Sequence, residues 1–139
     1  MIEKNRVKKN FSKHSSTYDE NALVQTYMAD ELITFIGLDK CENILEIGCG
    51  TGLFSVRLTD RYRNANFRMV DISQEMLNEA RKKLSGYNIE FEAGDGEKIE
   101  LKCRYDLITG NAVIQWFENL EKSLKRFYDK LNDGGEIVF

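Results

Sequence analysis

Proline is absent from this chain of 139 residues, and cysteine occurs only three times. With no proline-rich linker, no repeat and no low-complexity segment, the sequence offers no obvious internal domain boundary. Cys41, Cys49 and Cys103 are odd in number and lack the spacing of metal ligands. We therefore expect reduced thiols in a cytoplasmic protein, with no metal site.

Long apolar runs and an excess of positive charge are also missing. The longest apolar stretches fall far short of the ~20 residues that a membrane span needs. The basic N-terminus has no apolar core behind it, as a secretory signal would. The net charge is −3, whereas nucleic-acid-binding domains are usually basic. These absences argue against a membrane protein and against a nucleic-acid partner.

Two helices are expected ahead of the first strand. A basic helix is predicted over about residues 3–13, and a second helix over about residues 21–36, with Gly37 as the natural residue to follow its end. The apolar residues of the second helix fall on one stripe, which is typical of a helix that packs on a core. That stripe consists of Val24, Met28, Leu32 and Phe35.

From residue 43 onward, short apolar strands alternate with amphipathic helices. Strands are predicted at 43–47, 67–71, 88–93, 105–109 and 136–139, and helices at about 52–61, after the N-cap Ser73, and at about 120–131. This order predicts an α/β fold with a doubly wound, mostly parallel sheet. Apolar and polar residues alternate strictly over 88–93, which indicates an edge strand with one solvent-exposed face.

The most informative segment is the loop of residues 48–52, Gly-Cys-Gly-Thr-Gly, between a predicted strand and a predicted helix. Gly48 permits a tight turn, and Gly50 lets a ligand approach the backbone near the helix N-terminus. Leu53 stands where the dinucleotide fingerprint has its third glycine. Glu46, just ahead of the loop, would repel a pyrophosphate and attract a ligand with an amino group and a sulfonium. The alternative is a turn that merely needs glycine.

Two aspartates follow later strands. Asp71 closes the second strand, where a carboxylate accepts hydrogen bonds from both hydroxyls of an adenosine ribose. The alternative role for Asp71 is an ordinary helix-capping residue ahead of Ser73. Asp95 lies between Gly94 and Gly96 after the third strand, where it can accept the adenine amino group or serve only as a turn residue.

Residues 43–139 resemble the class I S-adenosylmethionine-dependent methyltransferases through this glycine loop. The resemblance implies a Rossmann-like methyltransferase fold with S-adenosylmethionine as the cofactor. It places the methionine part beside the glycine loop, the ribose at Asp71 and the adenine at Asp95. The cofactor-binding residues that it implies are Glu46, Gly48, Cys49, Gly50, Gly52, Asp71, Ile72, Met76, Asp95, Gly96 and Asn111.

A narrower resemblance, to the malonyl-acyl-carrier-protein O-methyltransferases of biotin synthesis, rests on two segments. These are the N-terminal residues Val7, Phe11-Ser12, Thr17-Tyr18-Asp19, Asn21-Ala22 and Val24-Gln25, and the segment 111–116 with its Gln-Trp pair. The implied substrate is the malonyl carboxylate on acyl-carrier protein, or a small carboxylate. Residues 1–40 would form a helical lid, and residues 41–139 the S-adenosylmethionine-binding domain.

Four residues are assigned to the lid and the substrate side. Tyr18 and Gln25 are expected in the lid, although Tyr18 packed against the following helix is an equal alternative. Gln115 and Trp116 are expected to line the substrate side, with a core position as the alternative for Trp116. No His–Asp or Cys–His arrangement is needed, because a carboxylate with a pKa near ~4 is already a nucleophile. His14 is interpreted as a surface histidine.

Members of the resembled family continue past the fifth strand, so the resemblance predicts a truncated chain in which five strands are present and the C-terminal strands are missing. Strand 136–139 would then be an open apolar edge, through which we expect self-association. Basic clusters such as Lys8, Lys9 and Lys13 offer docking for an acidic carrier protein, or are simply solvated faces.

Three other functions remain as alternatives. The chain could methylate another small acid or a quinone, or bind S-adenosylmethionine without catalysis. A nicotinamide-dependent oxidoreductase is the third alternative, against which Glu46 and Leu53 argue.

Overall fold

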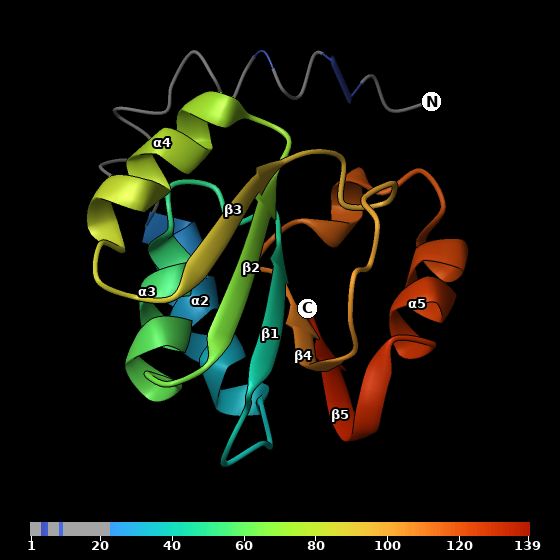
Figure 1. Cartoon of the computed structure of the whole chain (residues 1–139). Helices are drawn as coiled ribbons and strands as arrows, with labels where there is room; N and C mark the ends of the chain where they lie inside the picture. The colour runs from blue at the N-terminus through green and yellow to red at the C-terminus, as the bar shows by residue number, and fades with distance from the viewer. Residues whose placement is uncertain (1–3, 6–8, 10–22) are drawn as a thin grey trace.

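The computed structural model describes residues 4, 5, 9 and 23–139 (Figure 1). Most of the predicted first helix, together with Tyr18 and His14, lies outside these residues. The described helices and strands are α2 Leu23–Phe35, β1 Asn43–Ile47, α3 Leu53–Arg61, β2 Asn66–Asp71, α4 Gln74–Lys83, β3 Ile89–Ala93, β4 Tyr105–Thr109, the 3-10 turn η2 Ile114–Trp116, α5 Leu120–Tyr128 and β5 Leu131–Val138.

The five strands form one sheet in the order β3-β2-β1-β4-β5, and every neighbouring pair is parallel. The predicted doubly wound parallel sheet is therefore confirmed. β3 lies at an edge, as its alternation indicated. The predicted N-cap is also present, because the Ser73 side chain accepts a hydrogen bond from the backbone N–H of Met76.

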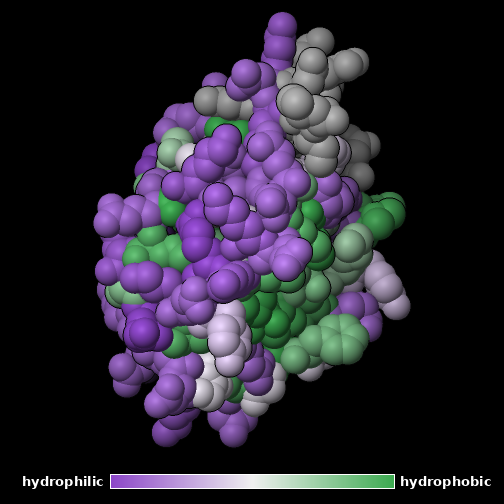
Figure 2. All heavy atoms as spheres, turned by 90° about the vertical axis from the view of Figure 1, so that its right-hand side faces the viewer, coloured by the Kyte–Doolittle hydropathy of each residue, from purple (hydrophilic) through white to green (hydrophobic). Residues whose placement is uncertain are grey.

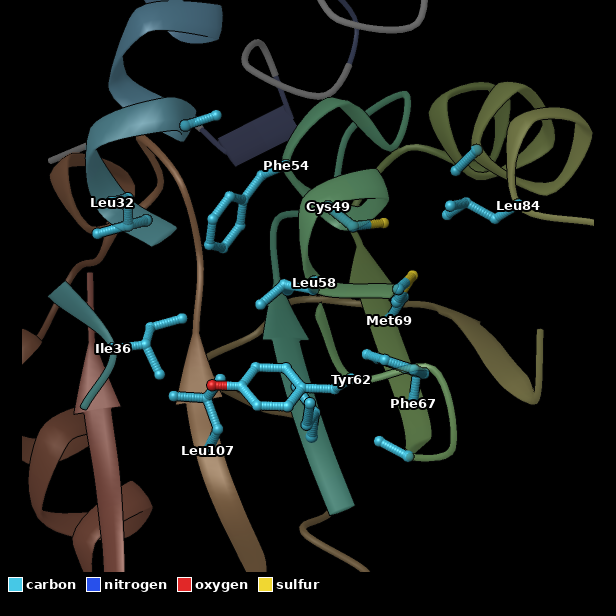
Figure 3. Close-up of a cluster of buried hydrophobic side chains, with 14 of the residues drawn as sticks. Leu32, Ile36, Cys49, Phe54, Leu58, Tyr62, Phe67, Met69, Leu84 and Leu107 are labelled. Atoms are coloured by element: carbon cyan, nitrogen blue, oxygen red, sulfur yellow. The ribbon is translucent and has the colours of Figure 1, made fainter. Parts of the chain in front are cut away.

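Helices cover both faces of the sheet, with α2, α3 and α4 on one side and α5 on the other (Figure 1). Side chains alternate across a strand, so β1 contributes to both layers. Ile44 joins the cluster that includes Leu58 of α3, shown in Figure 3, whereas Leu45 and Ile47 pack with Phe127 of α5. The same alternation turns Glu46 toward α3, under the glycine loop.

The predicted core stripe of α2 is confirmed for Leu32 and wrong for its other three residues. Val24 and Phe35 are 67% and 71% exposed, and Met28 is exposed as well. The buried face of this region instead consists of Ala29, Leu32 and Ile36. Apolar residues surround much of α2, so hydrophobicity alone did not identify the inward side. Small Ala29 lies on the side that packs against the core. Gly37 does not take the left-handed conformation expected of a residue that follows a helix end.

The last strand differs from its prediction. α5 ends at Tyr128, and β5 begins at Leu131 rather than at residue 136. The register shifts, because Tyr105 pairs with Leu131 whereas Leu107 pairs with Glu136. The glycines expected to form a turn before the strand therefore lie in an irregularity within it, where Gly134 has a φ of +76°.

The described residues place no strand on the outer side of β5. Apolar side chains gather on this α5–β5 face, where Leu120 is 40% and Tyr128 is 72% exposed (Figure 2). Ile137 and Phe139 line the same shallow surface. Self-association through this edge stays a prediction. No helix among the described residues is long and apolar enough to span a membrane.

Glu97 anchors the start of α5. Its carboxylate accepts the backbone N–H groups of Glu118 and Asn119 at 2.8 and 2.9 Å, the Ser123 hydroxyl at 3.0 Å, and the Lys4 ammonium. Burial alone would raise the pKa of Glu97, but these donors outweigh it and lower the pKa to about 2. The charged carboxylate therefore holds the loop ahead of α5 against the rest of the domain.

Replacing Glu97 by glutamine is expected to lower the free energy of unfolding at pH 7 by about 2 kcal/mol, because hydrogen bonds to a charged acceptor are lost. Since the folded pKa lies below the ordinary value of 4.5, this stabilisation is present above pH 4.5 and disappears as the pH falls toward 2. Urea denaturation of both proteins at several pH values measures it. A difference that persists undiminished at pH 2 would contradict this explanation.

Candidate active-site cleft

Most of the sequence-predicted site residues that the structure describes meet at the carboxyl ends of β1, β2, β3 and β4. Strand order reverses between β1 and β4, and ligands of open α/β sheets bind at such a switch point. A cleft lies there, with Gly48, Asp71 and Asn111 among the residues that line it. A smaller hollow adjoins it, because Gly48, Gly50 and Asn111 line both.

All the predicted cofactor-binding residues except Gly52 line one of these two hollows. Gly52 instead precedes α3 in a left-handed conformation, and a Cβ there would lie 3.4 Å from the backbone of Ala80. Those that line the larger cleft are Gly48, Gly50, Asp71, Ile72, Met76, Asp95, Gly96 and Asn111, and the smaller hollow adds Glu46 and Cys49.

The glycine loop is pinned to β2 and open toward the cleft. The N–H groups of Gly48 and Cys49 both donate to the Val70 carbonyl, at 2.7 and 3.0 Å. A Cβ at Gly48 would lie 2.5 Å from a Val113 methyl group, whereas a Cβ at Gly50 would meet nothing within 4 Å. The backbone at Gly50 therefore has free space above it, where a ligand can approach.

Asp71 ties this loop to the start of α4. Its Oδ2 accepts the N–H of Gly50 at 2.8 Å, and its Oδ1 accepts the N–H of Ser73 at 2.9 Å. Burial raises the pKa of Asp71 above its ordinary value, although these backbone donors oppose the shift. The expected alternative role, a turn-capping aspartate, is thus present, and the same side chain also lines the cleft.

Asp95 and Gly96 form another part of the cleft wall. Asp95 Oδ1 accepts the N–H of Glu97 at 3.1 Å, so it shapes the turn as well as facing the cleft. Lys4 also lines the cleft, and its ammonium lies 2.9 Å from both carboxylate oxygens of Asp95. A Cβ at Gly96 would lie 2.3 Å from an Ile47 methyl group, so this turn packs tightly on β1.

Glu46 is a buried carboxyl at the bottom of the smaller hollow. Its side chain is 1% exposed, and its Oε2 accepts the Ser55 hydroxyl at 2.6 Å. Burial raises the pKa of Glu46 to about 8, with the Ser55 hydrogen bond lowering it and the Asp71 charge raising it. A cationic group placed in this hollow would favour the ionised form of Glu46.

The loop after β4 closes the methionine end of the predicted site. The Asn111 side-chain amide donates to the Gln25 carbonyl at 3.0 Å, which brings α2 against this loop. Gln25 lines the smaller hollow. Ala112 lines the larger cleft with a φ of +55°, an unfavourable conformation for a residue other than glycine.

Gln115 and Trp116 both lie in η2, but only one of them lines the cleft. Trp116 lines the cleft and is 37% exposed, so it is not a core residue. Gln115 lines neither hollow, and its amide donates to the Ala112 carbonyl at 2.7 Å. Sequence reasoning gave no site role to Lys4, Ser55, Ala112, Val113 or Phe117, although Ala112 and Val113 lie in the segment 111–116 that carries the narrower resemblance.

Comparison with known proteins identifies a family. Residues 44–135 match the family described as methyltransferase domain. The chain is 43% identical over 141 residues to a malonyl-[acyl-carrier protein] O-methyltransferase of Ilyobacter polytropus, covering 100% of this chain and 54% of that protein. A Priestia megaterium protein named malonyl-[acyl-carrier protein] O-methyltransferase is 37% identical, with 100% and 52% covered. The chain thus spans about half the length of the curated relatives that it matches.

A solved structure has a similar fold over most of this chain. It is an S-adenosylmethionine-dependent methyltransferase from Clostridium acetobutylicum, with a TM-score of 0.70 and 25% sequence identity. The similarity covers 90% of this chain and 55% of that one.

Proposed function

The chain belongs to the methyltransferase domain family, and from this membership we propose that its cleft binds S-adenosylmethionine for methyl transfer to the malonyl carboxylate of an acyl-carrier protein. One observation carries the cofactor assignment. Two carboxyl groups, Glu46 and Asp71, flank the same glycine loop, one in the smaller hollow and one in the larger cleft. An elongated ligand with an ammonium end and a ribose matches that pair.

The residues present fit this cofactor. Gly50 leaves open space above the loop, where a Cβ would meet no other atom. Asp71 has both oxygens fixed by backbone N–H groups, so it is held ready for the ribose hydroxyls. Ile72 and Met76 offer apolar surface for the adenine beside Asp95. Glu46 lines the smaller hollow, where its carboxyl group is available to an ammonium group.

The substrate assignment rests on the relatives, whose names state malonyl-[acyl-carrier protein] as the methylated molecule. When bound, the cofactor supplies an electrophilic methyl group on a sulfonium. A malonyl carboxylate is ionised at neutral pH and needs no general base. The work of this chain is then to orient the two reactants and to exclude water. Trp116 and Phe117 form cleft walls suited to that task.

A nicotinamide dinucleotide fits the same cleft less well. Its pyrophosphate would have to lie over the glycine loop, beside the Asp71 carboxyl group. Like charges in a site of low polarity repel strongly. NAD therefore serves as the negative control in the test.

The test is a calorimetric titration of S-adenosylhomocysteine and NAD into the chain, followed by incubation of the chain with S-adenosylmethionine and malonyl-acyl-carrier protein. We expect S-adenosylhomocysteine to bind and NAD not to bind. Mass spectrometry of the carrier protein should show one added methyl group, with acetyl-carrier protein, which lacks the free carboxylate, left unchanged. Binding without methylation would limit the chain to a cofactor-binding module, and binding of NAD alone would overturn the assignment.

A further inference from the structure

Ser55 lies in the first turn of α3 with its side chain turned inward. It is 0% exposed, and its hydroxyl donates to Glu46 Oε2 at 2.6 Å. Because Glu46 sits on the strand below this helix, the bond joins α3 to the bottom of the smaller hollow. A buried position that needed only packing would be filled equally well by alanine.

A carboxyl group without a fixed partner can rotate and present either oxygen. With Oε2 held by Ser55, the orientation of Glu46 is set by the packing of α3 on β1. Gln25 and Asn111 line the same hollow, and the Asn111 side-chain amide donates to the Gln25 backbone carbonyl. The hollow is thus lined by a carboxyl group and by amide groups.

We infer that Ser55 is a positioning residue for cofactor binding, whose hydroxyl holds Glu46 so that Oε1 is presented to the ammonium group of the bound cofactor. This inference rests on the proposed function. Ser55 itself does not line either hollow. It acts through Glu46, and removing its hydroxyl should affect only ligands that carry the amino-acid end.

The charges around Glu46 give this arrangement a measurable signature. The described titratable groups that face it are Asp71 from β2 and the Cys49 thiol from the glycine loop, whereas Ser55 and Gln25, from α3 and α2, are neutral. Burial raises the pKa of Glu46 to about 8, so the carboxyl carries a proton at pH 7. An arriving ammonium group favours the charged form. Binding should therefore release nearly one proton at pH 7.

The experiment compares two ligands and three variants of the whole chain. S-adenosylhomocysteine carries the amino-acid end, and 5′-methylthioadenosine lacks it. Ser55→Ala removes the hydroxyl, and Glu46→Gln removes the ionisable group. Thr59→Val is the matched control, because it removes a buried hydroxyl one turn along α3 that donates only to the Val56 carbonyl. Calorimetry in buffers of different ionisation enthalpy gives both affinity and proton release.

Ser55→Ala is expected to weaken the binding of S-adenosylhomocysteine about tenfold at pH 7 and to leave the binding of 5′-methylthioadenosine unchanged. Thr59→Val is expected to bind both ligands as the wild-type chain does. The pH at which proton release is half complete should rise by about one unit, the equivalent of that loss. Glu46→Gln should release no proton. Equal losses of both ligands in Ser55→Ala, or no loss, would overturn the inference alone. Failure of the wild-type chain to bind either ligand would overturn the proposed function with it.

Discussion

Replacing Gly50 by alanine is expected to weaken S-adenosylhomocysteine binding at least ~100-fold, which corresponds to ~2.7 kcal/mol. The loop backbone at Gly50 borders both hollows, and its N–H is fixed by Asp71. The added methyl group would meet no protein atom within 4 Å. It would instead occupy the space through which a ligand must approach the loop. The protein itself should lose only about 1–2 kcal/mol of stability, from the left-handed conformation at φ +56°.

Gly134→Ala is the matched control for this experiment. Gly134 also has a positive φ, +76°, and a Cβ there would also meet nothing within 4 Å, but it lies in β5 and lines neither hollow. We expect the same small loss of stability and unchanged binding. Thermal denaturation and calorimetric titration of both variants make the comparison. If Gly50→Ala binds as tightly as Gly134→Ala, the glycine loop is not the cofactor site.

The central strands could be predicted because their sequences combine two local signals. Asn43–Ile47 and Tyr105–Thr109 are short apolar runs bounded by polar residues, and the structure has both strands with these bounds. Asp71 ends β2 because it caps the turn into α4, and that same turn opens onto the cleft. The structural role and the proposed ligand-binding role thus coincide at this residue, and motif reasoning placed it at the cleft that it lines.

Features that depend on packing between distant elements could not be predicted. Ser55 contacts Glu46 only because α3 lies across β1, and no motif spacing links the two residues. Ala112 has a positive φ that its residue type disfavours, so nothing in the sequence marks it. Val24 and Phe35 of α2 were expected to pack in the core, but both are exposed. A helix that is apolar on several sides has no inward face until its neighbour is known.

Replacing Asp71 by alanine is expected to weaken S-adenosylhomocysteine at least ~100-fold as well, because two hydrogen bonds from ribose hydroxyls to a carboxylate are worth about 1.5–3 kcal/mol each. Part of that loss has another origin. The N–H groups of Gly50 and Ser73 lose their acceptor, and the loop can shift. A simple comparison of wild type and variant therefore does not isolate the ribose contact.

The 2′-deoxy analogue of S-adenosylhomocysteine separates the two effects. In the wild-type chain it should bind at least ~10-fold more weakly than the parent ligand, a difference of ~1.4 kcal/mol. In Asp71→Ala the two ligands should bind alike, because a displaced loop weakens both equally while only the ribose contact distinguishes them. The coupling between mutation and ligand change measures that contact directly. If the variant still prefers the parent ligand by the full wild-type ratio, Asp71 serves the fold as a turn cap, and the ribose is held by another group.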